Sequence, residues 1–412
     1  MTIVAPIQGP ATGSALARCA GEVDAFLASD WGARARIRRR DAGSRGFGDL
    51  LTLDDVDRFL TTTALRTPFF RLVQAGEHIP ESAYTRSGRA GSRDVSGVAD
   101  PAAVASLFER GATIVLQGVH RWSEPVTRFC RDLELHLGHA CQVNAYVTPP
   151  GAQGLDLHHD PHDVFVLQAF GRKRWQVHAA PMEAERPPLD VEVESGDTIY
   201  MPRGTPHAAS AQDTVSGHLT VGVHVATWRD VVREAFNAAT QADEMLDARL
   251  PAGWLTNDEA VAEELAARLR SVTDRMASLD PRQTLERRSD RFLSGRAQLA
   301  RGSIVERAAP RELHDDTVVR RRAGSVCEVR VQADELTILL GDRRLTMPTW
   351  LEPALLHVAA SEELQVADLA DMVPDPASRI VLVRRLIREG LLTAALAPGP
   401  DMGSDDPPSV IE

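Results

Sequence analysis

The residues best suited to chemistry lie in two short motifs near the middle of the 412-residue chain. The first, LHHDPHD over 157–163, contains His158 and Asp160, and the second, GDTIYMPRGTPHAA over 196–209, contains His207. In an extended strand, residues i and i+2 project from the same face, so the His158 imidazole and the Asp160 carboxylate can converge on one point. Two histidines and one carboxylate that leave coordination positions open form the facial triad of non-haem Fe(II) oxygenases.

The alternative is an exposed His-x-Asp pair without a metal, since the chain has 13 histidines. The order of the segments favours the metal site: His-x-Asp, a strand, a glycine turn, a strand, a Gly-Asp turn, a strand, then His207. The other histidines of this region lack a carboxylate at the same spacing or lie on a less favourable strand face. They are His159, His162, His178, His218 and His224. His218 and His224 share a face with Thr220 and Gly222, so they can line a cavity.

Lys173 is the only lysine in a chain whose Lys and Arg residues number 46. In RKRWQVH, over 172–178, strand alternation places Lys173, Trp175 and Val177 on one apolar, inward face. An unpaired ammonium inside a barrel costs several kcal/mol, and no acidic residue alternates inward nearby, so the pattern predicts a bound anion. A compact ammonium fits a tight pocket that excludes the broader guanidinium. The alternative is a surface lysine near an exposed end of the barrel.

The pattern of helices and strands expected around these residues predicts an α+β fold. Short β-like segments separated by Pro and Gly fill 142–227, as in a closed or sandwich-like β unit. Helical patterns dominate from 229, followed by paired strands and further helices toward the C-terminus. The predicted divisions are a disordered lead-in over 1–22, a catalytic domain over 23–228, a helical domain over 229–305, a winged-helix-like domain over 306–396 and a disordered tail over 397–412.

Composition narrows the class of protein. The net charge of -12 argues against general affinity for nucleic acid or for an anionic membrane, because both need a positive surface field. No run approaches the apolar length of a membrane span, and the N-terminus lacks a signal-peptide pattern. The four cysteines form no CxxC pair, which favours a reducing compartment, and we expect a cytoplasmic protein.

The segments NAYVTPPGAQGLDLHHDPHDVFVLQAFGRKRW and SGDTIYMPRGTPHAA together resemble the JmjC/cupin oxygenases, specifically the ribosomal oxygenase group. This resemblance implies a double-stranded β-helix (jelly-roll) domain with flanking helices, a helical dimerisation domain that forms a homodimer, and a C-terminal winged helix. It implies Fe(II) held by His158, Asp160 and His207, with 2-oxoglutarate and O2 as cosubstrates. Lys173 would pair with the distal carboxylate of 2-oxoglutarate, and Asn144 and Tyr146 would line the same pocket.

The activity that the resemblance implies is hydroxylation of a protein side chain, a His or Arg of a ribosomal protein. It also implies a small hydroxyl residue near position 222 on the last barrel strand, where this chain has Gly222 and the nearest hydroxyl is Thr220. Two alternatives stay open. One keeps the chemistry but acts on a peptide or small molecule of specialised metabolism. The other is a non-catalytic sensor joined to a DNA-binding winged helix, although the mixed charge of the C-terminal region favours a structural or protein-binding role.

Overall fold

The computed structural model describes residues 14–394, apart from 42, 44–45, 179–188, 242, 257–258, 297–302, 309–311, 323 and 333–334. The chain divides into two compact units, residues 8–284 and residues 285–412. The expected tail over 397–412 lies outside the described residues. Among the described helices, none is long and apolar enough to cross a membrane. The four cysteines are free thiols.

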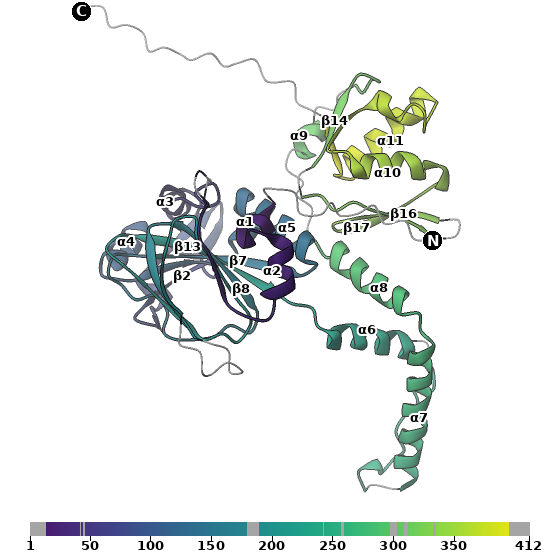
Figure 1. The fold of residues 1–412 in the computed structure, drawn as a ribbon, viewed down its shortest axis with the longest axis horizontal. Coiled ribbons are helices and arrows are strands. Elements are labelled where there is room, and N and C mark those ends of the chain that lie inside the picture. Colours follow the sequence, from purple (N-terminus) through teal and green to yellow (C-terminus); the bar gives the residue numbers. More distant parts are fainter. Residues whose placement is uncertain are drawn as a thin grey trace, which may run out of the picture. The chain divides into compact units, whose positions relative to one another are not determined.

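The larger unit is built around an eight-stranded sheet with the strand order β1-β11-β8-β13-β7-β6-β2-β3 (Figure 1). Every residue of two of its strands, β6 and β11, is buried. The strands are β1 (Arg36–Arg38), β2 (Phe70–Gln74), β3 (Glu77–His78), β6 (Thr113–Leu116), β7 (Ala140–Thr148), β8 (Asp163–Phe170), β11 (Thr198–Met201) and β13 (Ser216–His224).

A second sheet has three antiparallel strands in the order β10-β9-β12, which are β10 (Leu189–Glu194), β9 (Arg172–Val177) and β12 (His207–Ala211). Burial alternates along β9, where Lys173, Trp175 and Val177 are buried and Arg174 and Gln176 are exposed. Trp175 and Val177 pack with Val164 and Val166 of β8 in one hydrophobic cluster. The two sheets therefore enclose a shared interior.

Helices cover the outside of the eight-stranded sheet. α5 (Glu124–Leu137) contacts β7, and it ends at Gly138, whose positive φ of 68° favours glycine. α3 (Leu53–Thr62) is capped by Thr52, whose side chain accepts a hydrogen bond from the Asp55 N–H. The remaining elements before the second sheet are α2 (Val23–Ser29), α4 (Pro101–Glu109) and the hairpin of β4 (Thr85–Ala90) and β5 (Arg93–Ala99).

The N-terminal segment corrects one prediction. A disordered lead-in was expected over 1–22, but α1 (Ala15–Ala20) begins at Ser14, whose side chain accepts a hydrogen bond from the Ala17 N–H. Leu16 and Cys19 are buried against the main core, so α1 belongs to the folded unit. Residues 1–13 lie outside the described part of the chain.

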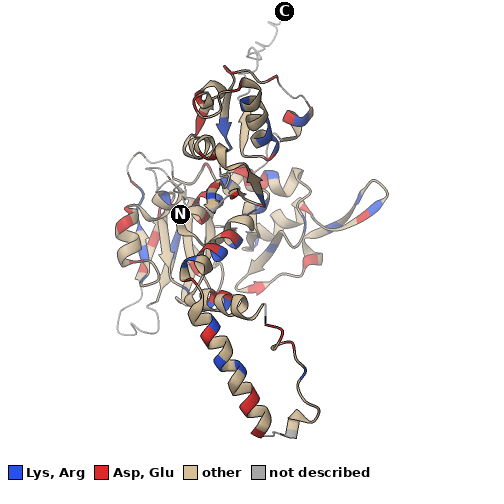
Figure 2. Cartoon of the chain, turned by 90° about the vertical axis from the view of Figure 1, so that its right-hand side faces the viewer, with Lys and Arg blue, Asp and Glu red and all other residues tan. Residues whose placement is uncertain are grey.

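Helices follow the barrel as predicted: α6 (Trp228–Thr240) and α7 (Glu259–Ser278) contact each other, and α8 (Pro281–Ser294) comes next. The apolar side chains of α7 are only partly covered, since Val272 is buried whereas Leu265 and Leu269 are each 56% exposed. Figure 2 shows side chains of both charges mixed along the helices that follow the barrel.

The C-terminal unit has its own core, formed mainly by α10 (Glu352–Ala360), α11 (Pro376–Arg388) and two small antiparallel sheets. The first sheet has the order β18-β14-β19 and the second the order β15-β16-β17. The other elements are α9 (Ser303–Ala308), β14 (Val318–Arg321), β15 (Glu328–Gln332), β16 (Glu335–Leu340), β17 (Arg343–Met347), β18 (Glu363–Gln365) and β19 (Leu392–Ala394).

Candidate metal centre and adjoining cavity

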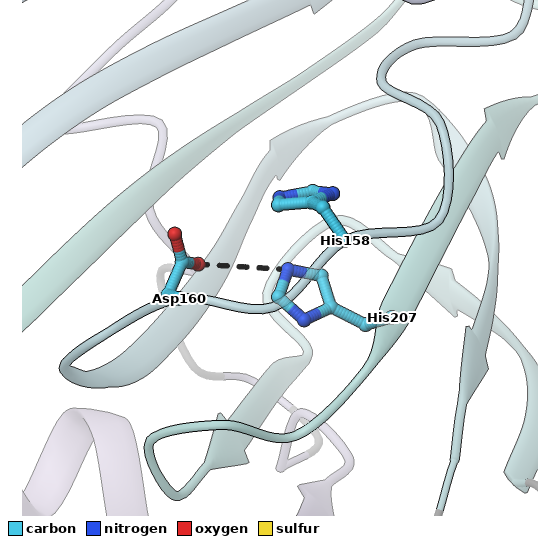
Figure 3. A group of neighbouring side chains, drawn as sticks. All are labelled: His158, Asp160 and His207. Atoms are coloured by element: carbon cyan, nitrogen blue, oxygen red, sulfur yellow. Dashed lines mark ion pairs between the residues drawn. The ribbon is translucent and has the colours of Figure 1, made fainter.

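His158, Asp160 and His207 converge, and their potential ligand atoms all lie within 4.8 Å of one another (Figure 3). The His207 Nε2 lies 3.6 Å from Asp160 Oδ2, and the two imidazole ring centres are 4.4 Å apart. Among the described residues, this is the group of three or more His, Cys, Asp or Glu side chains that has metal-binding geometry. Two imidazoles and one carboxylate suit a divalent transition metal with open positions.

The backbone that brings the three side chains together differs from the expected strand. His158 and Asp160 lie in the loop before β8, and His158 forms an isolated antiparallel bridge with His207, the first residue of β12. The two residues exchange backbone hydrogen bonds, at 3.1 Å from the His158 N–H and 2.8 Å from the His207 N–H. The convergence therefore comes from pairing with β12 rather than from alternation within a regular strand.

Both imidazoles are oriented by the backbone carbonyls near them. The Nδ1 of His158 lies 2.8 Å from the Asp156 carbonyl oxygen, and the Nδ1 of His207 lies 2.9 Å from that of Thr205. A carbonyl only accepts, so each Nδ1 carries the hydrogen and each Nε2 keeps a lone pair for a metal ion. Burial lowers the pKa of His207, which further favours the neutral ligand form. The donor set thus fits the metal that the sequence suggests.

A cavity adjoins the triad between the two sheets. Its walls combine the three triad residues with residues from β6, β7, β8, β9, β12 and β13 and from the loop before β8. The lining residues are Thr113, Tyr146, Thr148, Gly154, Leu155, His158, Asp160, Val164, Val166, Lys173, Trp175, His207, Ala209, His218 and Thr220. A ligand in this cavity would therefore contact a metal held by the triad and the only lysine of the chain.

Lys173 is buried, with 1% of its surface exposed, so the surface-lysine alternative is wrong. Its Nζ lies 2.9 Å from the Thr148 hydroxyl and 3.1 Å from His218 Nδ1, and neither partner is an anion. Burial lowers the pKa of Lys173 to about 7. An ammonium in this position is stabilised when an anion enters the cavity, because its desolvation is otherwise uncompensated.

Aromatic rings surround the inner end of the cavity. Tyr146 stacks on His218 at 5.1 Å with 8° between the planes, and Trp175 meets His218 edge-on at 5.3 Å. The Trp175 Nε1 is buried and has no hydrogen-bond partner in the described part of the chain. A buried N–H without a partner, in a residue that lines the same cavity as Lys173, fits a ligand that is rich in oxygen acceptors, such as a dicarboxylate.

The two other predicted pocket residues, Tyr146 and Asn144, differ in their placement. Tyr146 lines the cavity, and burial raises the pKa of its hydroxyl, which stays neutral. Asn144 is not among the lining residues; its Oδ1 accepts a hydrogen bond from the Gly118 N–H at 2.9 Å, and it hydrogen-bonds to Tyr146. Asn144 can therefore influence the cavity only indirectly, through its hydrogen bond to Tyr146. The sequence patterns missed Thr148, whose contact with Lys173 depends on strand pairing rather than local spacing.

Gly222 has a specific neighbour that accounts for the missing side chain. A Cβ at position 222 would lie 2.6 Å from His162 Cε1, so the His162 ring occupies the space that a side chain would need. The His162 ring also lies 5.1 Å from that of His224. Thr220, two residues toward the inner end, lines the cavity. His159 is exposed, and neither it nor His178 lines the cavity.

Comparison with known proteins agrees with this architecture. Residues 120–231 match the family model described as JmjC domain. The chain is 34% identical over 188 residues to ribosomal oxygenase 1 of Homo sapiens, covering 41% of this chain and 29% of the relative. It is also 34% identical over 169 residues to the bifunctional lysine-specific demethylase and histidyl-hydroxylase NO66 of Branchiostoma floridae, covering 40% of this chain and 27% of the relative. The matches thus span under a third of either relative.

Among solved structures, the Escherichia coli ribosomal oxygenase YcfD in complex with cobalt and 2-oxoglutarate has a similar fold. The TM-score is 0.56 at 18% sequence identity, with 91% of this chain and 99% of that chain covered. The same protein in complex with cobalt and succinic acid gives a TM-score of 0.54 at 19% identity, covering 91% and 99%.

Residues 120–231 thus match a JmjC domain, and the fold of the chain is similar to that of YcfD. More particularly, 41% of this chain is similar in sequence to ribosomal oxygenase 1.

Proposed function

We propose that this protein is an Fe(II)- and 2-oxoglutarate-dependent dioxygenase that hydroxylates a protein side chain. The observation that carries the proposal is one cavity with a triad of metal-ligand geometry and, at its inner end, a buried ammonium without an anionic partner. These two features match the two ends of 2-oxoglutarate, whose 2-oxo acid group chelates a metal and whose distal carboxylate needs a cation. Cobalt and 2-oxoglutarate in the structurally similar YcfD agree with this assignment.

In this proposal the residues of the chain bind and orient the reactants. His158, Asp160 and His207 hold the metal through two Nε2 atoms and a carboxylate oxygen, leaving positions for the cosubstrates. Lys173 binds the distal carboxylate, while neutral Tyr146 and the Trp175 indole N–H shape the inner end. When bound, Fe(II) would supply the redox chemistry that couples oxidation of 2-oxoglutarate to succinate and CO2 with insertion of one oxygen atom from O2 into a C–H bond.

The proposed target is a His or Arg residue of a ribosomal protein. Support comes from the names of the relatives, which are ribosomal oxygenases and a histidyl-hydroxylase. Intact-mass spectrometry of ribosomal proteins from a strain lacking the gene tests the target directly. We expect one protein to be lighter by the mass of one oxygen atom, and the wild-type gene to restore it while the Asp160→Ala gene does not. Identical spectra with and without the gene would refute a ribosomal target.

We also propose that the helices after the barrel form a homodimer. Large apolar side chains are exposed on α6 and α7, including Trp228 at 78%, Phe236 at 46% and Leu265 at 56%. An exposed apolar face of this kind suits burial against a second copy. Sedimentation at micromolar concentration should give a dimer, and Leu265→Asp together with Leu269→Asp should give a monomer. A strictly monomeric wild type would contradict this part of the proposal.

For the C-terminal unit, the helix and strand order of α10, α11 and the β18-β14-β19 sheet supports a winged-helix-like domain. We propose a structural or protein-binding role for it. Both signs of charge are present on α11 and its neighbours: Arg385 pairs with Glu389 at 2.8 Å, and Arg379 pairs with Asp315 at 2.6 Å. Duplex-DNA binding that weakens steeply with salt would contradict this role.

A further inference from the structure

Lys173 has an incomplete set of partners. An ammonium has three N–H donors. One is directed to the Thr148 hydroxyl at 2.9 Å and a second to His218 Nδ1 at 3.1 Å. Both partners come from the eight-stranded sheet, Thr148 from β7 and His218 from β13, whereas Lys173 projects from β9 of the smaller sheet. With two donors held from across the barrel, the third is left for a ligand in the cavity.

The contact with His218 defines which nitrogen of that ring carries a proton. The Lys173 ammonium can only donate, so His218 Nδ1 must be unprotonated and the hydrogen must be on Nε2. The ring is 4% exposed, and burial together with the Lys173 charge lowers the pKa of His218 well below its ordinary value. Stacking on Tyr146 and the edge of Trp175 fix the ring plane. His218 is therefore a neutral, oriented hydrogen-bond acceptor.

We propose that His218 is a positioning residue for the distal carboxylate of the cosubstrate, acting through Lys173. Its Nδ1 and the Thr148 hydroxyl together fix the rotation of the ammonium about the Cε–Nζ bond. The free N–H is then directed into the cavity before the ligand arrives, which lowers the entropy cost of forming the ion pair. This inference rests on the proposed function, because it takes a dicarboxylate as the ligand.

Variants of His218 can keep, move or remove the acceptor atom at the position of Nδ1. In His218→Asn the amide oxygen can occupy the place of Nδ1, whereas in His218→Gln it lies near the place of Nε2, and His218→Leu has no acceptor. The affinity of the anaerobic Fe(II)-loaded protein for 2-oxoglutarate, measured by calorimetry, should change less than about threefold in the Asn variant. It should weaken about tenfold or more in the Gln and Leu variants, because a hydrogen bond to a charged group is lost. Fe(II) affinity should be the same in all four proteins.

The single lysine permits a second measurement on the wild type. Labelling with 15N-lysine gives one side-chain ammonium signal, which should be protected from exchange in the 2-oxoglutarate complex of the wild type and the Asn variant. In the Gln variant the signal should exchange rapidly. If a variant does not fold, the 15N chemical shift of His218 Nδ1 in the wild type decides, since a protonated Nδ1 would overturn the inference.

The outcomes distinguish the inference from the proposed function. Failure of the wild type to bind 2-oxoglutarate would overturn both. Tight binding by the wild type and equally by the Gln and Leu variants would overturn only the positioning role. Equal weakening in the Asn, Gln and Leu variants would show that the ring itself is needed, which also overturns the role of Nδ1 as acceptor.

Discussion

Two buried basic side chains in this molecule have opposite surroundings. Arg330 of β15, 5% exposed, pairs with Glu328 at 2.6 Å and with Asp290. Lys173 of β9 is 1% exposed, and its hydrogen-bond partners are a hydroxyl and a neutral imidazole. Where a buried cation serves only the fold, the chain provides its own carboxylates. A buried cation without carboxylate partners, such as Lys173, lowers the stability of the fold. Residues that lower stability in this way are typical of functional sites.

The largest expected effect comes from removing the lone ammonium. Lys173→Met should weaken 2-oxoglutarate binding about a hundredfold or more, because losing one partner of a buried charge pair costs about 2–5 kcal/mol. Calorimetry on the metal-loaded protein measures this, and metal affinity should not change. Arg174→Met is the matched control, since the neighbouring Arg174 is exposed and pairs with Asp190. An equal loss of 2-oxoglutarate affinity in both variants would show that inward and outward residues of β9 do not differ in their role.

The same contrast predicts opposite changes in stability. Glu328→Gln should destabilise the C-terminal unit by about 1–3 kcal/mol, because it takes one of two carboxylates from the buried Arg330. Lys173→Met should instead stabilise the ligand-free protein, because it removes a buried charge that lacks a counter-ion. Denaturant unfolding at pH 7 checks both changes. A lower free energy of unfolding in Lys173→Met would show that the buried ammonium does not destabilise the ligand-free protein.

The two regions should also differ in their response to pH. In the empty cavity Lys173 loses its proton near pH 7, so 2-oxoglutarate binding must be accompanied by proton uptake above that pH. The hydrogen-bond partners of Nζ, Thr148 of β7 and His218 of β13, are not carboxylates, and the one carboxylate that lines the cavity is Asp160 of the triad. Affinity should fall by up to about tenfold per pH unit above 7. A profile that is flat to pH 9 would contradict this prediction.

Protonation of Lys173 also links the stability of the larger unit to pH. The folded pKa lies below the ordinary value of 10.5, so the unfolded chain holds more protons between pH 7 and 10.5. The wild-type free energy of unfolding should therefore rise with pH over this window relative to Lys173→Met. Denaturant titrations of the ligand-free proteins at several pH values measure the difference, and parallel curves would contradict the assignment.

The smallest effect is expected at the outer end of the β13 face. Gly222→Ser should destabilise the protein by about 1–2 kcal/mol, because its Cβ would lie 2.6 Å from His162 Cε1. His162→Ala in the same chain should restore stability. Binding of 2-oxoglutarate should stay unchanged in both, since the inner end of the cavity is not altered. A Gly222→Ser protein as stable as the wild type would show that the His162 ring moves freely.

Local sequence patterns predicted much of the site because the relevant rules are local. Alternation along β9 placed Lys173 and Trp175 inside, and the order of the motifs predicted the triad. Local patterns could not predict contacts between residues that are distant in the sequence. His218 and Lys173, which form a hydrogen bond, are 45 positions apart in the chain. The His162 ring lies against Gly222. Helix α1 was missed because six residues are too few to show a helical period, and its helix is stabilised by burial.

The central claim is that the triad and the lone ammonium serve one oxidation reaction. The most direct test is to measure 2-oxoglutarate consumed and succinate formed by the Fe(II)-loaded wild type, alongside Asp160→Ala and Glu328→Gln. We predict one succinate for each 2-oxoglutarate in the wild type and in folded Glu328→Gln, and none in Asp160→Ala. No succinate from the wild type, or undiminished succinate from Asp160→Ala, would contradict the account.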